Sequence, residues 1–138
     1  MATNILRFMV PKSLVVYINE SSTVRQALEK MNYHKYTAVP VIDGEGKYVG
    51  TLRSDDIFKY FMKVKSFDKA LAEDVSITEI MDRANSKPVP HNTSMSELIE
   101  GVKEHNFVSV VDDRGCFIGI ILRREILNYL LDFYRENV

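Results

Sequence analysis

The chain has 138 residues, of which 46% are apolar and 27% charged, so it can bury a core and is not a disordered tail. Its 18 Lys and Arg against 19 Asp and Glu give a net charge of -1, without the basic excess typical of nucleic-acid-binding proteins. The apolar runs are too short for a membrane span, no signal peptide is evident, and one cysteine cannot form an internal disulfide, so we expect a cytoplasmic protein with neither nucleic acid nor membrane as a partner.

The predicted elements form two copies of one unit, in which Gly50 and Gly119, for example, lie 69 positions apart. Each copy is expected to have a short strand, a helix, two strands joined by a turn rich in Asp and Gly, and a second helix. In the first copy the helices and hairpin strands are expected around residues 24–31, 38–42, 48–52 and 57–62. In the second copy they are expected around residues 95–102, 107–111, 117–122 and 126–131.

The two copies differ in their connections. Residues 63–76 are charged and lack Pro and Gly, which predicts a linker with one helical turn around residues 68–73. Met31 to Asp43 spans twelve positions and Val102 to Asp112 spans ten, which predicts a shorter helix-to-strand loop in the second copy. Neither copy is large enough to bury its own core, so the two should pack as one pseudo-symmetric body.

The repeated motifs resemble the CBS domain, and the whole chain resembles a CBS pair, or Bateman module. Residues 36–43 look like the family's strand, and residues 50–57 look like its nucleotide motif Gly-x-apolar-Thr-x-x-Asp-Ile. The resemblance implies an α/β (α+β) fold of tandem CBS domains, each a small β-sheet flanked by two helices and packed with pseudo-two-fold symmetry. It assigns residues 5–63 to the first CBS motif, 64–77 to the linker and 78–135 to the second motif.

A narrower resemblance is to the small stand-alone CBS-pair proteins of bacteria that bind cyclic di-AMP. It is carried by residues 8–9, 36–38, 107–110 and 117–127. The resemblance implies two nucleotide clefts, each using both copies. The cleft favoured for the cyclic dinucleotide comprises Lys12, Leu14, Val16, Tyr36, Thr37, Ala38, Pro40, Leu122, Arg123 and Arg124.

The chemistry of these residue types fits a nucleotide. Strand-edge residues can form an apolar slot for adenine, and Tyr36 can stack on a base. Thr37 and the pair Arg123 and Arg124 can donate to phosphates, and the arginines precede a predicted helix whose first amides favour an anion. Without the family pattern, adjacent arginines are usually solvated surface, and Tyr36 can equally be a core or dimer-interface residue.

The second cleft would comprise Arg53, Ser54, Asp56, Phe107 and Ser109. Arg53 and Leu122 stand where the family's motif has Thr or Ser. Asp56 is the carboxylate that would bind a ribose, and Glu125 replaces it in the second copy. AMP or ATP therefore fits the first cleft less well, and we expect the second cleft to be empty, weak or structural because Arg53 can fill it.

No catalytic arrangement is evident in the sequence. His34 and His105 fall in predicted loops and His91 precedes a helix; none has a carboxylate or Cys partner at ligand spacing. Cys116 lacks a paired His, and no Gly-rich phosphate loop is present. We therefore expect no enzyme, no metal and no cofactor.

The expected function is signal transduction by an adenine-nucleotide-sensing regulatory protein, a cyclic di-AMP receptor that acts in trans on an unidentified effector protein. Apolar helix faces at residues 57–62 and 126–134 predict a homodimer. One alternative is a CBS sensor of AMP, ADP or ATP that uses Asp56. Another is a ligand-free structural dimerisation module, which the departures at Arg53 and Leu122 favour.

Overall fold

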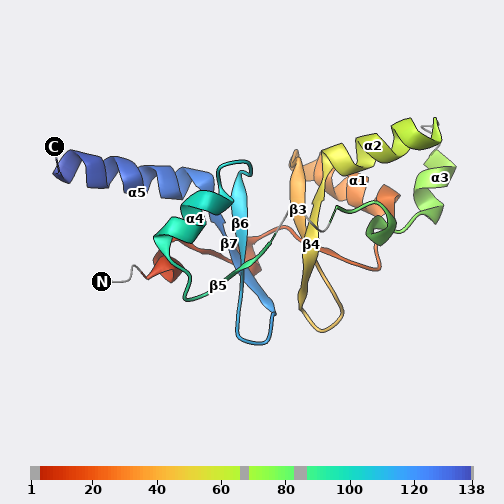
Figure 1. Ribbon diagram of the computed structural model, residues 1–138. Coiled ribbons are helices and arrows are strands. Elements are labelled where there is room, and N and C mark those ends of the chain that lie inside the picture. The colour runs from red at the N-terminus through yellow and green to blue at the C-terminus, as the bar shows by residue number, and fades with distance from the viewer. Residues whose placement is uncertain (1–3, 66–68, 83–86, 138) are drawn as a thin grey trace. The chain divides into compact units, whose positions relative to one another are not determined.

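The computed structural model describes residues 4–65, 69–82 and 87–137, without the side chains of residues 69 and 71. These residues form two compact units (Figure 1). The first-repeat unit holds the described part of Val16–Ser86, and the second-repeat unit holds the described parts of Met1–Val15 and Lys87–Val138. Each unit contains one small sheet with helices, which confirms the mixed α/β (α+β) class expected from the sequence.

The first-repeat unit contains a three-stranded sheet in the order β2-β3-β4. Strand β2 runs parallel to β3, and β3 runs antiparallel to β4. The elements are β2 (Ile18–Asn19), α1 (Val24–His34), β3 (Ala38–Ile42), β4 (Tyr48–Arg53), α2 (Ser54–Val64), α3 (Lys69–Asp74) and the 3-10 helix η3 (Ile77–Glu79). Helix α1 begins after Thr23, whose hydroxyl accepts from the backbone N of Gln26 while the Gln26 side chain accepts from the backbone N of Thr23.

The second-repeat unit contains a four-stranded sheet in the order β1-β7-β6-β5. Its elements are η1 (Ile5–Phe8), β1 (Val10–Pro11), η2 (Lys12–Leu14), β5 (Val89–Pro90), α4 (Met95–Gly101), β6 (Phe107–Val111), β7 (Phe117–Leu122) and α5 (Arg123–Glu136). Strand β1 pairs antiparallel with β7, with Val10 opposite Ile120, and Ile5 is buried in the core of this unit. The N-terminal segment therefore completes the sheet of the second repeat.

Both hairpins have the same turn, as the repeat predicts. In each turn an Asp carboxylate, of Asp43 or Asp112, accepts hydrogen bonds from the backbone N–H groups two and four residues later, at 2.8 to 3.0 Å. Gly46 and Gly115 follow with φ values of 86° and 83°, which L side chains rarely adopt. The turn chemistry thus fixes the register of both hairpins.

The segment predicted as a linker contributes to the first-repeat unit. Helix α3 packs against α1, and the side chains of Ala72, Val75 and Ile77 are buried in the core. The backbone N of Val24 donates to Val75 O at 2.9 Å, which ties the end of this segment to the start of α1. Residues 66–68, which include the start of the predicted helical turn, lie outside the described residues.

The prediction of a shorter loop in the second repeat is wrong, because the helix is shorter instead. Helix α1 has 11 residues and α4 has 7, whereas residues 35–37 connect α1 to β3 and residues 102–106 connect α4 to β6. His34 is accordingly the last residue of α1 and not a loop residue. Helix α4 ends at Gly101, a poor helix former that lies so close to β6 that a Cβ atom there would be 2.7 Å from Val108 Cγ2.

Candidate functional site

In the first-repeat unit, the beginning of β3 lies next to the beginning of α2. The backbone N of Ser54 donates to Thr37 O at 2.9 Å, and Ala38 is opposite Arg53 in the antiparallel ladder. The structure therefore brings together residues that the sequence had assigned to two different clefts. Of the others, Pro40 is buried in β3, while Val16 packs, partly buried, against the core of this unit.

Tyr36 lies at the C-terminal end of α1, where its ring is available for stacking. The side chain is 49% exposed, and its ring stacks on that of His34 with centroids 5.6 Å apart and planes 10° apart. Tyr33 makes an edge contact with His34 in turn. Tyr36 is therefore not a core residue, and a planar group can reach it from solvent.

Asp56 is a buried carboxylate in the first turn of α2. The residue is 8% exposed, and its Oδ2 accepts from the backbone N of Arg53 at 3.0 Å. Burial raises the pKa of Asp56 above the ordinary 3.8, and the charge of Asp82 adds to the rise, although the Arg53 hydrogen bond and the charges of Arg53 and Lys59 oppose it. With Asp55 beside it, Asp56 makes the start of α2 acidic and unfavourable for phosphate.

In the second-repeat unit, the beginning of α5 lies next to the loop before β6. The backbone N of Arg123 donates to Asn106 O at 2.8 Å, and Phe107 is opposite Leu122 in the ladder. The 3-10 helix η2, which contains Lys12 and the exposed Leu14, packs beside β7. Part of the set predicted for the first cleft is thus assembled within this unit.

The two arginines at the start of α5 have different surroundings. The Arg123 side chain is engaged by the backbone, because its Nε donates to Val102 O at 2.8 Å. The Arg124 side chain is 75% exposed, and its Nε lies 3.9 Å from Glu125 Oε1, which is a weak surface pair. Leu122 at the N-cap has no polar side chain to cap the first amides of α5. This helix start therefore combines two cationic side chains and one carboxylate, that of Glu125, with the positive end of the helix dipole, and its net positive charge suits a phosphate.

Ser109 has a buried hydroxyl in the middle of β6. The residue is 4% exposed, and its Oγ has no hydrogen-bond partner among the described residues. An unsatisfied buried hydroxyl costs about 1–3 kcal/mol. The hydroxyl is therefore a destabilising feature of the sheet as described.

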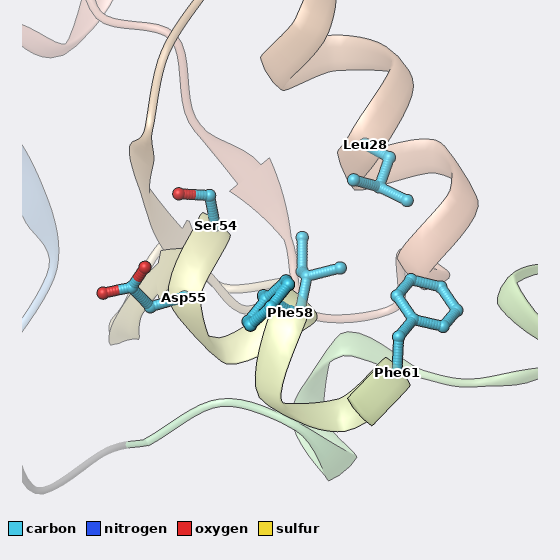
Figure 2. Close-up of a pocket in the computed structure, with 6 residues that line it drawn as sticks. Leu28, Ser54, Asp55, Phe58 and Phe61 are labelled. Atoms are coloured by element: carbon cyan, nitrogen blue, oxygen red, sulfur yellow. The ribbon is translucent and has the colours of Figure 1, made fainter. Parts of the chain in front are cut away.

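An open groove of about 420 Å³ lies between α1 and α2 of the first-repeat unit (Figure 2). Leu28 of α1 faces Phe58 and Phe61 of α2 across it, and Ser54 and Asp55 lie towards the start of α2. The lining is mostly apolar, and its one charged group is a carboxylate. The groove therefore suits an apolar side chain better than a phosphate.

Within the described part of the chain, no group of three His, Cys, Asp or Glu side chains lies close enough to hold a metal ion. The same part of the chain contains no helix that is long and apolar enough to cross a membrane.

The sequence matches the model of the CBS domain over residues 8–63 and again over residues 74–132. The chain belongs to the CBS domain family. The two matches correspond to the two repeats, which confirms the CBS pair and the tandem CBS fold expected from the sequence. The binding of a nucleotide by the predicted residues stays a prediction.

Two curated relatives are informative. An uncharacterized protein of Methanocaldococcus jannaschii is 30% identical over 137 residues, which cover 89% of this chain and 48% of that protein. This chain therefore spans about half the length of the archaeal relative. Cyclic di-AMP receptor B of Bacillus subtilis is 25% identical over 129 residues, which cover 90% of this chain and 84% of the receptor.

Solved structures share the fold. The structure of CbpB in complex with c-di-AMP superimposes with a TM-score of 0.83 at 23% identity, over 99% of this chain and 92% of that one. The structure of CBSX2 in complex with AMP gives a TM-score of 0.71 at 24% identity, over 95% of this chain and 98% of that one. At these identities the likeness shows the fold alone.

Proposed function

We propose that the chain is a regulatory protein that binds an adenine nucleotide, and that this nucleotide is cyclic di-AMP. The observation that carries the proposal is the similarity to cyclic di-AMP receptor B, because it extends over 90% of this chain and 84% of the receptor. The similarity therefore covers most of the length of the receptor. The fold likeness to CbpB, whose structure contains c-di-AMP, agrees with this proposal.

The beginning of α5 supports an anionic ligand. Arg124 is exposed there, and the first amides of the helix have no side-chain cap from Leu122. Cyclic di-AMP carries two phosphates, each of which accepts charge-assisted hydrogen bonds. The proposed ligand-binding residues are those expected from the sequence: Lys12, Leu14, Val16, Tyr36, Thr37, Ala38, Pro40, Leu122, Arg123 and Arg124.

A second candidate is a sensor of AMP, ADP or ATP, which Asp56 and the AMP complex of CBSX2 favour. A carboxylate accepts hydrogen bonds from ribose hydroxyls. Asp56 already accepts one from the backbone of Arg53 and is largely buried, so the acceptor capacity left for a ribose is limited. For this reason we place the mononucleotide second.

The proposal includes a homodimer that acts in trans. Helices α2 and α5 expose large apolar side chains that their own units do not cover: Phe58, Met62, Leu127, Leu130, Leu131, Phe133 and Tyr134. Isologous pairing of such faces would remove them from water. The ligand would then favour one of two states, of which an unidentified effector protein binds one. We also propose a cytoplasmic location, with which a lone free cysteine is consistent.

Thermal unfolding with a panel of nucleotides tests the proposal: cyclic di-AMP, cyclic di-GMP, AMP, ATP and S-adenosylmethionine. A ligand at about 100 times its Kd stabilises the folded state by about 2.7 kcal/mol, which is a shift of several degrees in Tm. Cyclic di-AMP should give that shift and cyclic di-GMP should not. A shift with AMP or ATP alone would favour the second candidate. If no adenine nucleotide shifts the Tm, the result would favour the remaining alternative, a ligand-free dimerisation module.

A further inference from the structure

The loop between α4 and β6, residues 102–106, is held at both ends by Arg123. The backbone N of Arg123 donates to Asn106 O at 2.8 Å. Its side chain reaches the other end of the loop, where Nε donates to Val102 O at 2.8 Å and Nη2 lies 3.5 Å from Lys103 O. One residue at the start of α5 therefore fixes both ends of this loop.

The first repeat closes the same connection differently. Helix α1 ends with Lys35 in the left-handed conformation, at φ 60°, and the backbone N of Tyr36 donates to Met31 O at 2.9 Å. Helix α4 is four residues shorter than α1, and Val102 at its C-cap has φ -97° and ψ 3°, so this end has no left-handed residue. Ser54 holds the position equivalent to Arg123 and has no comparable side chain.

A guanidinium group is well suited to the end of α4. Carbonyl groups at a helix C-terminus lack intrahelical partners and carry the negative end of the helix dipole. A cation there is favourable, and its planar donors can bind two carbonyls at once. Arg123 therefore adds a side-chain contact to the backbone bonds at the end of α4, which run from Val102 N to Leu98 O and from Lys103 N to Glu100 O.

We propose that Arg123 is a positioning residue of the ligand site, whereas Arg124 donates to a ligand phosphate. The proposal rests on the proposed function. The Nε hydrogen is engaged by Val102 O and Nη2 lies near Lys103 O, so a phosphate could take the bidentate Nε and Nη2 edge of Arg123 only by displacing these loop carbonyls. Holding the loop also fixes the start of β6 at Phe107, which is opposite Leu122 and next to the arginines. The two adjacent arginines thus have separate roles.

The test compares Arg123→Gln with Arg124→Gln as a matched pair, because each removes one charge from adjacent positions. The first readout is hydrogen exchange of the loop amides of Val102 and Lys103, which donate to Leu98 O and Glu100 O, in ligand-free protein. The second is the Kd for cyclic di-AMP at about 0.01 M and about 0.15 M salt, since added salt screens charge contacts. Binding is measured well below the Tm of each variant.

Arg123→Gln should accelerate exchange in the loop by roughly tenfold or more and weaken binding, while the salt dependence of binding stays that of wild type. Arg124→Gln should leave loop exchange unchanged, weaken binding by roughly tenfold or more, and reduce the salt dependence. The proposal would be overturned if Arg123→Gln weakened binding and reduced its salt dependence while loop exchange stayed unchanged. Arg123 would then be a direct phosphate ligand.

Two other outcomes are informative. Faster exchange in Arg123→Gln with unchanged affinity would overturn the positioning role and leave a purely structural one. Failure of wild type to bind cyclic di-AMP would refute the proposed function, and the Arg123 positioning role would fall with it. The exchange comparison would still show separately whether Arg123 holds the loop.

Discussion

The pairing of β1 with β7 depends on the absence of a side chain at Gly119. A Cβ atom there would lie 2.4 Å from Val10 O, about 1 Å short of the 3.4 Å at which ordinary contact begins. It would also lie 2.7 Å from Met9 Cγ and 2.8 Å from Met9 Sδ. The Met9 side chain can rotate away, but the Val10 carbonyl belongs to the backbone of β1. Gly119→Ala should therefore push β1 off the sheet.

The expected cost follows from overpacking, which typically destabilises a protein by about 1–3 kcal/mol. We expect a cost in the upper half of that range, because the Val10 carbonyl is a backbone group that cannot rotate away. Displacing β1 would also disturb Ile5, which lies upstream of β1 and is buried in the same core. The loss of roughly 2–3 kcal/mol should lower the Tm by roughly 6–15 °C. Gly44→Ala is the matched control, since a Cβ atom there would meet nothing within 4 Å.

The assay is urea unfolding followed by circular dichroism, together with limited trypsin digestion. Release of β1 should expose the peptide bonds after Arg7 and Lys12, so that Gly119→Ala is cut there faster than wild type or Gly44→Ala. If Gly119→Ala matches Gly44→Ala in stability and in cleavage, the close approach of β1 to β7 is refuted, and with it the placement of η2 beside the second-repeat sheet.

Three further predictions concern single side chains. Because burial raises the folded-state pKa of Asp56, the contribution of Asp56 to the free energy of unfolding should fall as the pH rises from 3.8 through that pKa. Urea unfolding should therefore show Asp56→Asn gaining stability relative to wild type over this interval, and a constant difference would contradict the shift. Ser109→Ala should stabilise the protein by up to about 1–3 kcal/mol, because it removes the buried hydroxyl that has no partner among the described residues. Thr51→Val loses a hydroxyl bonded to Tyr48 and should destabilise the protein by about 0.5–1.5 kcal/mol. A stability change of the same sign in both variants would refute the unsatisfied hydroxyl of Ser109. Leu131→Glu should give a monomer by light scattering while Asn128→Glu on the same helix stays dimeric, and an unchanged mass for Leu131→Glu would argue against α5 as a dimer contact.

The local elements could be predicted from the sequence because their signals are local. The Asp-to-Gly turns fix both hairpins, and the apolar stripes predict the helices within a few residues. The end of α4 lies within one residue of its apolar stripe, but α1 continues to His34, three residues past the last stripe residue Met31, so the longer first helix was missed. The close packing of Gly101 on Val108 is a tertiary contact with no local signal.

The long-range arrangement was harder to predict. Strand β1 has two residues and no periodicity, and its partner β7 lies about a hundred positions away in the chain. In the candidate site, the repeat identified the helix starts, but the adjacent arginines look equivalent in sequence. The tertiary contacts distinguish them, because the Arg123 side chain binds the carbonyls of Val102 and Lys103 whereas the Arg124 side chain is exposed.

Isothermal titration of cyclic di-AMP into the wild-type chain, with AMP as the competing ligand, tests the central claim most directly. We expect saturable binding of cyclic di-AMP, which excess AMP displaces weakly or not at all. Arg124→Gln should weaken this binding by roughly tenfold or more. No heat of binding with cyclic di-AMP, or saturable binding of AMP alone, would contradict the claim.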